Sequence, residues 1–175
     1  MQVEVVFALP ERQLLVSLEL PEARIRVIKP RVGGGFGDKQ ELVVEDLVSV
    51  LALRTGRPVR LEFTRAEELI AARYRHPQRI TMTTGVMNDG TIVANRMHVV
   101  ADTGAYGSHA LTVQGNTGQK VLPMYPVANI HFQVECVYTN NPISGAFRGY
   151  GAPQGCFALE CHMDEVAREL DRRAL

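Results

Sequence analysis

The sequence has no tryptophan and only three cysteines, Cys136, Cys156 and Cys161. An odd number of cysteines without a CxxC spacing argues against a disulfide framework, a zinc site or an iron–sulfur cluster held by this chain alone. No apolar run is long enough to span a bilayer. The 19 basic and 19 acidic side chains cancel to a formal net charge of +0. We therefore expect neither nucleic acid nor a membrane as a partner.

The first residues, Met1-Gln2-Val3-Glu4, lack the basic start of a signal peptide. The cytoplasm is therefore the expected location. The chain has 175 residues, of which 46% are hydrophobic and 22% charged. A chain of this length and composition is typical of about one globular domain. We predict a single domain over residues 1–175.

A glycine-rich stretch stands out between Arg31 and Gln40, where four glycines occupy five positions in Gly33-Gly34-Gly35-Phe36-Gly37. An apolar run at 24–28 predicts a strand before it, and helical spacing of apolar residues predicts a helix from about 40 to 54 after it. A strand, a glycine turn and a helix N-terminus together form a ready anion site.

The more familiar nucleotide motifs do not fit this stretch. The fingerprint G-x-G-x-x-G requires glycine at its sixth place, and the sixth residue counted from Gly33 is Asp38. A P-loop is excluded as well, since no Gly-Lys-Ser/Thr follows. A tight structural turn without any ligand stays open as the alternative.

A second glycine loop, Gly145-Ala146-Phe147-Arg148-Gly149-Tyr150-Gly151, precedes a predicted helix at 153–173. Arginine beside backbone N–H groups suits phosphate or another planar anion. An arginine that caps a carbonyl or pairs with a carboxylate is the alternative. Two such loops suggest one large, anionic, partly flat ligand gripped from two sides.

The rest of the pattern predicts an α+β fold with a mixed sheet and packed helices. Asn88-Asp89-Gly90 is a hairpin signal, and Thr64 with Glu67 is a capping-box pattern that opens a helix at 65–72. The five histidines lack metal-ligand spacing, and no nucleophile elbow is present, so we assign no metal ligand and no catalytic residue within the chain. Further strands are predicted at 1–9, 59–63, 79–87, 91–102 and 130–138, a helix at 10–20, and a loop with a helical part at 111–124.

Five motifs, taken in order, resemble the molybdenum-cofactor-binding part of the xanthine dehydrogenase and aldehyde oxidase family of molybdenum hydroxylases. They are 32–40 (VGGGFGDKQ), 55–60 (TGRPVR), 75–77 (RHP), 139–140 (TN) and 145–154 (GAFRGYGAPQ). The resemblance runs from about Pro21 to Leu175, while residues 1–20 match only loosely.

This resemblance implies a molybdopterin whose dithiolene, rather than a protein side chain, holds molybdenum. It implies hydroxylation of a purine, N-heteroaromatic or aldehyde carbon, with electrons leaving through iron–sulfur clusters and FAD on partner chains or domains. The matching positions carry over as follows: Gly35, Phe36, Gly37 and Arg148 would bind the cofactor, and Gln40, Phe147 and Tyr150 would contact the substrate.

Two departures from the family pattern limit what the resemblance implies. Gln40 stands where mammalian-type xanthine enzymes carry a substrate-orienting glutamate, which leaves purine specificity open. The family's general-base glutamate is expected downstream of Leu175, and general-base catalysis needs that carboxylate at the substrate. We therefore expect a fragment or small split subunit that is inactive without the remaining molybdopterin-binding segment. A non-catalytic module that binds a cofactor or anion, or serves assembly, is the alternative.

Overall fold

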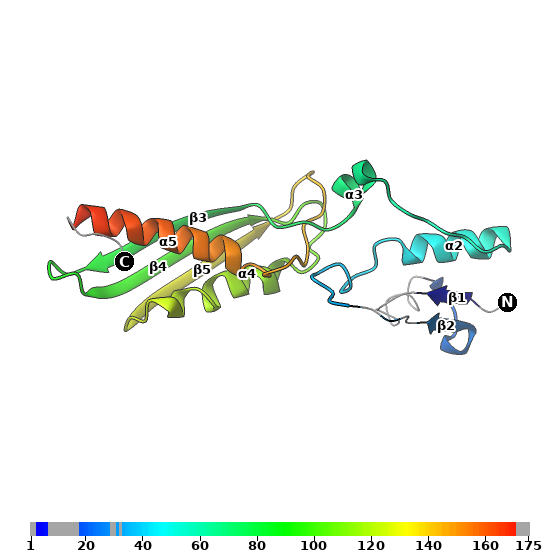
Figure 1. Ribbon diagram of the computed structural model, residues 1–175, viewed down its shortest axis with the longest axis horizontal. Coiled ribbons are helices and arrows are strands. Elements are labelled where there is room, and N and C mark those ends of the chain that lie inside the picture. The colour runs from blue at the N-terminus through cyan, green and yellow to red at the C-terminus, as the bar shows by residue number, and fades with distance from the viewer. Residues whose placement is uncertain (1–2, 7–17, 29–30, 32, 171–175) are drawn as a thin grey trace. The chain divides into compact units, whose positions relative to one another are not determined.

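The computed structural model describes residues 3–6, 18–28, 31 and 33–170. The chain divides into two compact units, Met1–Ala72 and Arg73–Leu175. Figure 1 shows the helices and strands of each unit. The elements are β1 (Val3–Val6), η1 (Glu22–Arg24), β2 (Ile25–Ile28), α2 (Glu45–Thr55), α3 (Arg65–Ala71), β3 (Gln78–Val86), β4 (Ile92–Asp102), α4 (Ala110–Gln119), η2 (Leu122–Met124), β5 (Asn129–Val137) and α5 (Ala152–Glu169). A single domain over 1–175 stays a prediction.

The first unit contains a two-stranded parallel sheet, in which Val3 of β1 pairs with Ile25 of β2. Leu18 and Ile25 form a small buried cluster, against which apolar side chains of the following loop and of α2 pack. The strand predicted at 24–28 is confirmed, and the one predicted at 1–9 is found at its centre. The helix predicted at 10–20 lies largely outside the described residues.

Helix α2 begins five residues later than the predicted start near 40. The carboxylate of Glu45 accepts hydrogen bonds from the amide N–H groups of Val43 and Val44, at 2.7 and 2.8 Å. These bonds satisfy two amides just ahead of the helix, so the chain turns before Glu45 and becomes helical after it. The predicted end is confirmed, because Gly56 adopts a φ of +64° and its N–H bonds the carbonyl of Ala52.

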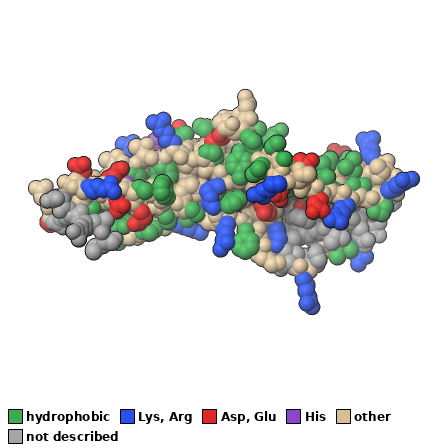
Figure 2. Space-filling view, turned by 45° about the horizontal axis from the view of Figure 1, so that its top comes forward, with side chains coloured by type: hydrophobic (Ala, Val, Ile, Leu, Met, Phe, Trp, Pro, Cys, Tyr) green, Lys and Arg blue, Asp and Glu red, His purple; other side chains and the backbone are tan. Residues whose placement is uncertain are grey.

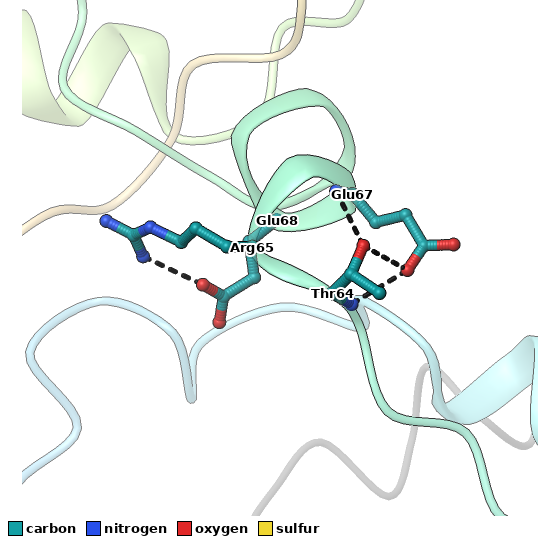
Figure 3. Close-up of polar contacts among 4 residues, drawn as sticks. All are labelled: Thr64, Arg65, Glu67 and Glu68. Carbon is teal, nitrogen blue, oxygen red and sulfur yellow. Dashed lines mark hydrogen bonds and ion pairs between the residues drawn. The ribbon is translucent and has the colours of Figure 1, made fainter.

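Helix α3 starts with the predicted capping box (Figure 3). The Thr64 hydroxyl accepts the Glu67 N–H at 3.3 Å, and the Glu67 carboxylate accepts the Thr64 N–H at 2.7 Å. The bonds from Thr64 lower the pKa of the exposed Glu67 carboxyl. The strand predicted at 59–63 is wrong. No described strand pairs with this segment, and an extended segment needs a pairing partner to form a sheet.

The second unit is built on a three-stranded mixed sheet in the order β3-β4-β5. Strands β3 and β4 form the predicted antiparallel hairpin through Asn88-Asp89-Gly90, and β5 pairs with β4 in parallel. Helices α4 and α5 pack against this sheet (Figure 1). The mixed sheet with packed helices confirms the predicted α+β class.

The core of the second unit lies between β4, the segment after α4, and α5. Met97, Val99 and Ala101 are buried and alternate along β4 with less buried neighbours, so their side chains share one face of the sheet. They meet Leu159 of α5, which is fully buried, and the pair Val121 and Leu122. Complete burial of each large apolar side chain is worth about 1.5–3 kcal/mol. This core fixes both ends of the second glycine loop, since that loop joins the end of the sheet to α5.

The visible surface carries basic and acidic side chains interspersed with each other and with hydrophobic ones (Figure 2). This mixture accords with the formal net charge of +0. None of the helices in the described ranges combines the length and hydrophobicity that a bilayer crossing requires.

Candidate functional site

The first glycine loop is held in shape by its own backbone and by one lysine. The N–H of Asp38 bonds the carbonyl of Gly35 at 3.1 Å, and the N–H of Gln40 bonds that of Gly37 at 3.3 Å. The Lys39 ammonium donates to the carbonyls of Gly34 and Gly33, at 2.7 and 3.3 Å. These contacts occupy the carbonyls of the four glycines, whereas the N–H groups of Gly34, Gly35 and Gly37 meet no acceptor in the described part of the chain.

Phe36 is the unusual residue of this loop. Its φ is +53°, a conformation that a bulky residue rarely adopts, and its side chain is 63% exposed. Such strain persists only where the surrounding structure enforces it, and it is common at ligand sites. An exposed aromatic ring on a strained turn offers a flat apolar surface beside the free backbone donors.

Three of the four glycines differ in how strongly the structure requires glycine there. Gly37 has a φ of +121°, and a Cβ on Gly34 would lie 2.6 Å from the Phe36 ring. Gly35 has neither constraint, because the nearest described atom to its Cβ would be on Lys39, at an ordinary 3.5 Å. The packing of the described residues therefore does not require glycine at this position.

The predicted anion site at a helix N-terminus is wrong for this loop. The loop ends before α2 begins, and the start of α2 already has the carboxylate of Glu45, which is only 3% exposed. An anion placed there would meet a negative charge instead of free N–H groups.

The second glycine loop is also strained, and again at an aromatic residue. Tyr150 has a φ of +49°, between Gly149 at +93° and Gly151 at +92°. The Tyr150 N–H bonds the Phe147 carbonyl at 2.7 Å, which closes a tight turn with Arg148 at its tip. Four described non-glycine residues have positive φ, and two of them, Phe36 and Tyr150, are aromatic residues of the two predicted loops.

Helix α4 supports the second loop from one side. The Tyr150 hydroxyl lies 2.5 Å from Nδ1 of His109 and 2.8 Å from the hydroxyl of Thr112. A Cβ on Gly151 would lie 2.1 Å from the carbonyl oxygen of Val113. The backbone of the loop therefore lies directly against α4 and has little freedom to move. His109 and Thr112 carry no motif or spacing that would have marked them in the sequence.

Arg75 supports the same loop from another direction. Its Nη2 donates to the Arg148 carbonyl at 2.8 Å, and its guanidinium lies 4.8 Å from the centre of the Phe147 ring. In the sequence, Arg75 belongs to a motif that resembles the family but carries no predicted role of its own. Its signal in the sequence is that motif, Arg75-His76-Pro77, alone.

The carboxyl ends of β4 and β5, which run parallel, are tied together just before the second loop. Asp102 accepts hydrogen bonds from the hydroxyl of Thr139 at 2.7 Å, the N–H of Gly104 at 2.7 Å and the amide of Asn141 at 2.5 Å. Partial burial raises the pKa of the Asp102 carboxyl, but these bonds and the nearby His76 outweigh it, so the pKa is lowered overall. The strand ends, and the loop that leaves them, are thereby fixed.

Comparisons with known proteins agree with this geometry. Residues 8–175 match the family described as the molybdopterin cofactor-binding domain. The chain belongs to the molybdopterin cofactor-binding domain family.

Three relatives illustrate the similarity. The chain is 42% identical over 159 residues to a probable hypoxanthine oxidase of Escherichia coli O157:H7, covering 91% of this chain and 17% of that protein. It is 37% identical over 153 residues to the nicotinate dehydrogenase large molybdopterin subunit of Eubacterium barkeri, covering 87% and 36%. The solved aldehyde oxidoreductase of Desulfovibrio gigas superposes with a TM-score of 0.85 at 31% identity, covering 93% and 18%. The chain thus spans about a fifth of the length of the first relatives that it matches.

The described residues fit a molybdopterin. Its phosphate and dithiolene are anionic, and the first loop offers N–H groups at Gly34, Gly35 and Gly37 that meet no acceptor among the described residues. The exposed Arg148 adds a positive charge at the tip of the second loop. No group of three or more His, Cys, Asp or Glu side chains suited to a metal ion occurs in the described ranges.

The structure places the predicted site residues in two sets. Gly35, Phe36, Gly37 and Gln40 lie in one continuous turn of the first unit, and Gln40 belongs to that turn rather than to a helix. Phe147, Arg148 and Tyr150 lie in the tight turn of the second unit. The Tyr150 hydroxyl is engaged with α4, so what this residue offers a ligand is its ring. The individual roles of these residues stay predictions.

Proposed function

We propose that this chain supplies two loops of the molybdopterin site of an oxidoreductase. The enzyme would hydroxylate a carbon of a purine, an N-heteroaromatic ring or an aldehyde with oxygen from water. It would act in the cytoplasm, together with the rest of the molybdopterin-binding segment and with subunits or domains that carry iron–sulfur clusters and FAD. The relatives' names, which include a hypoxanthine oxidase, a nicotinate dehydrogenase and an aldehyde oxidoreductase, support this range of substrates.

One observation carries the proposal: in a chain of this family, backbone strain at aromatic residues coincides with the two glycine loops. Phe36 and Tyr150 both adopt positive φ, and each loop is braced by long side chains or by a neighbouring helix. Strain of this kind costs about 1–3 kcal/mol per residue and is retained where a preorganised backbone serves a ligand.

The residues of the chain would have the following roles. The backbone N–H groups around Gly35 and Gly37 would donate to the anionic cofactor, and the guanidinium of Arg148 would offset its charge. Phe36 would exclude water from the cofactor, while Phe147 and Tyr150 would present aromatic surface to a flat substrate. Gln40 would orient the substrate through its amide. The bound cofactor would supply the two-electron oxidation itself.

The test uses the complete enzyme that contains this chain. Molybdenum is measured by mass spectrometry and pterin by fluorescence after oxidation, for the wild type and for Gly35→Val and Arg148→Gln. Gly35→Val is informative because its Cβ would lie no closer than an ordinary 3.5 Å to any described protein atom. We expect both variants to lose roughly tenfold or more of the bound cofactor, while the matched controls Gly115→Ala and Arg79→Gln stay loaded.

Two results would contradict the proposal. Hydroxylation of any of the three substrate classes by a molybdenum-free preparation would refute the role of the cofactor. A fully loaded enzyme that oxidises none of them would refute the activity and would favour the non-catalytic binding module.

A further inference from the structure

Arg75 lies where the start of the second unit passes the second glycine loop, 73 residues away in the sequence from the group that it binds. We propose that Arg75 is the positioning residue of this loop: it fixes the backbone at Arg148 and the ring of Phe147 so that both are preset for the ligand. This inference rests on the proposed function of the loop and adds a residue whose own side chain need not touch the ligand.

Three contacts of one guanidinium carry the inference. Nη2 donates to the Arg148 carbonyl at 2.8 Å, Nη1 reaches Oε1 of Gln154 at 3.4 Å, and Cζ lies 4.8 Å from the centre of the Phe147 ring. A hydrogen bond from a charged donor is about twice as strong as a neutral one, and a cation over an aromatic ring adds an electrostatic attraction. A planar guanidinium can make all three contacts at once, which the single ammonium of a lysine cannot do.

The backbone on both sides of Arg75 is itself anchored. The Tyr74 hydroxyl donates to the Pro142 carbonyl at 2.6 Å, and the Tyr74 carbonyl accepts the N–H of Gly145 at 3.0 Å. On the other side, the Gln154 amide donates to the His76 carbonyl at 3.2 Å. The Arg75 side chain therefore extends from a fixed backbone segment to the loop, and it holds the loop in place relative to that segment.

Other contacts hold the remaining sides of the second glycine loop. The Tyr150 hydroxyl is held by His109 and Thr112, and Gly151 lies against the backbone of α4. Arg75 is the contact that reaches the carbonyl of Arg148 itself, at the tip of the turn. The Arg148 side chain is exposed. The hydrogen bond from Arg75 fixes its carbonyl, and with it the backbone from which the side chain extends.

The experiment compares Arg75→Gln, Arg75→Lys and Arg75→Ala in the complete enzyme with the matched control Arg79→Gln, an exposed arginine on β3. Three quantities are measured for each: the thermal midpoint, the molybdenum and pterin content, and the electron paramagnetic resonance signal of the molybdenum. Arg75→Ala is also assembled in the presence of free guanidinium at millimolar concentration, which can occupy the vacated volume.

We expect the molybdenum and pterin content of Arg75→Gln and Arg75→Ala to fall about tenfold or more, because removal of a group that orients a ligand-binding residue usually weakens binding by about tenfold to a hundredfold. Arg75→Lys should lose less and show an altered resonance signal. Guanidinium should restore loading of Arg75→Ala, and Arg79→Gln should match the wild type. The thermal midpoints should change less than the loading does.

Two results would overturn the inference alone: wild-type loading and signal in Arg75→Gln, or a loss of loading that follows the thermal midpoint and is not restored by guanidinium. The latter would mean that Arg75 only stabilises the fold. A wild-type enzyme without molybdenum or pterin would instead refute the proposed function, and the inference with it.

Discussion

Substitution of Gly151 by alanine is the sharpest test of the second loop's geometry, because this residue combines two separate constraints. Its φ of +92° lies in a region that side chains with a Cβ avoid, at a cost of roughly 1–2 kcal/mol. Its Cβ would also lie 2.1 Å from the Val113 carbonyl oxygen and 2.8 Å from the Thr117 hydroxyl. Overpacking of that kind costs roughly 1–3 kcal/mol more.

The two costs add to roughly 2–5 kcal/mol, a large share of the total stability of about 5–15 kcal/mol that a domain has. Urea unfolding followed by circular dichroism measures this loss as a lower midpoint. Gly56→Ala is the first control, since Gly56 has a φ of +64° and open space, so it should lose roughly 1 kcal/mol. Gly115→Ala is the second control, since this helical glycine has neither constraint and should gain up to about 1 kcal/mol.

A Gly151→Ala protein within about 0.5 kcal/mol of the wild type would refute the reasoning, because the loop could then rotate away from α4 without cost. Equal losses in Gly151→Ala and Gly56→Ala would show that the contact with Val113 contributes nothing and that only the backbone conformation matters.

Three further predictions follow from local contacts. Thr64→Ala should lose about 1 kcal/mol of unfolding free energy by removing the capping box, while Thr64→Ser should retain most of it; equal losses would contradict the cap. Because the pKa of Asp102 is lowered in the folded state, its stabilising effect should be present above its unfolded pKa and be lost as the pH falls through the folded value. Asp102→Asn should therefore flatten the acid limb of the urea midpoint against pH, and an unchanged limb would contradict this. Burial raises the pKa of the Cys136 thiol, so iodoacetamide at pH 8 should modify the exposed Cys161 first, as peptide mass spectrometry can show.

Much of the local structure follows directly from the sequence. Asn88-Asp89-Gly90 forms the expected hairpin, Thr64 and Glu67 form the expected cap, and Gly56 ends α2. Each of these signals acts over a few residues through the backbone conformation or hydrogen bonds of its own segment, so it can be read without the fold. The two errors in the predicted helices and strands have the same origin. The start of α2 and the absent strand at 59–63 depend on Glu45 and on a missing pairing partner, and helical or strand spacing records neither.

In the candidate site, too, some features follow from the sequence and others only from the tertiary structure. The sequence by itself determined the two glycine loops and the residues at their tips, because the glycines and aromatics lie together along the chain. Only the tertiary structure decided how the second loop is held. His109 meets Tyr150 across 41 residues and Arg75 meets Arg148 across 73. Such contacts exist only after the sheet, α4 and α5 have packed, since no local pattern fixes the distance between segments so far apart.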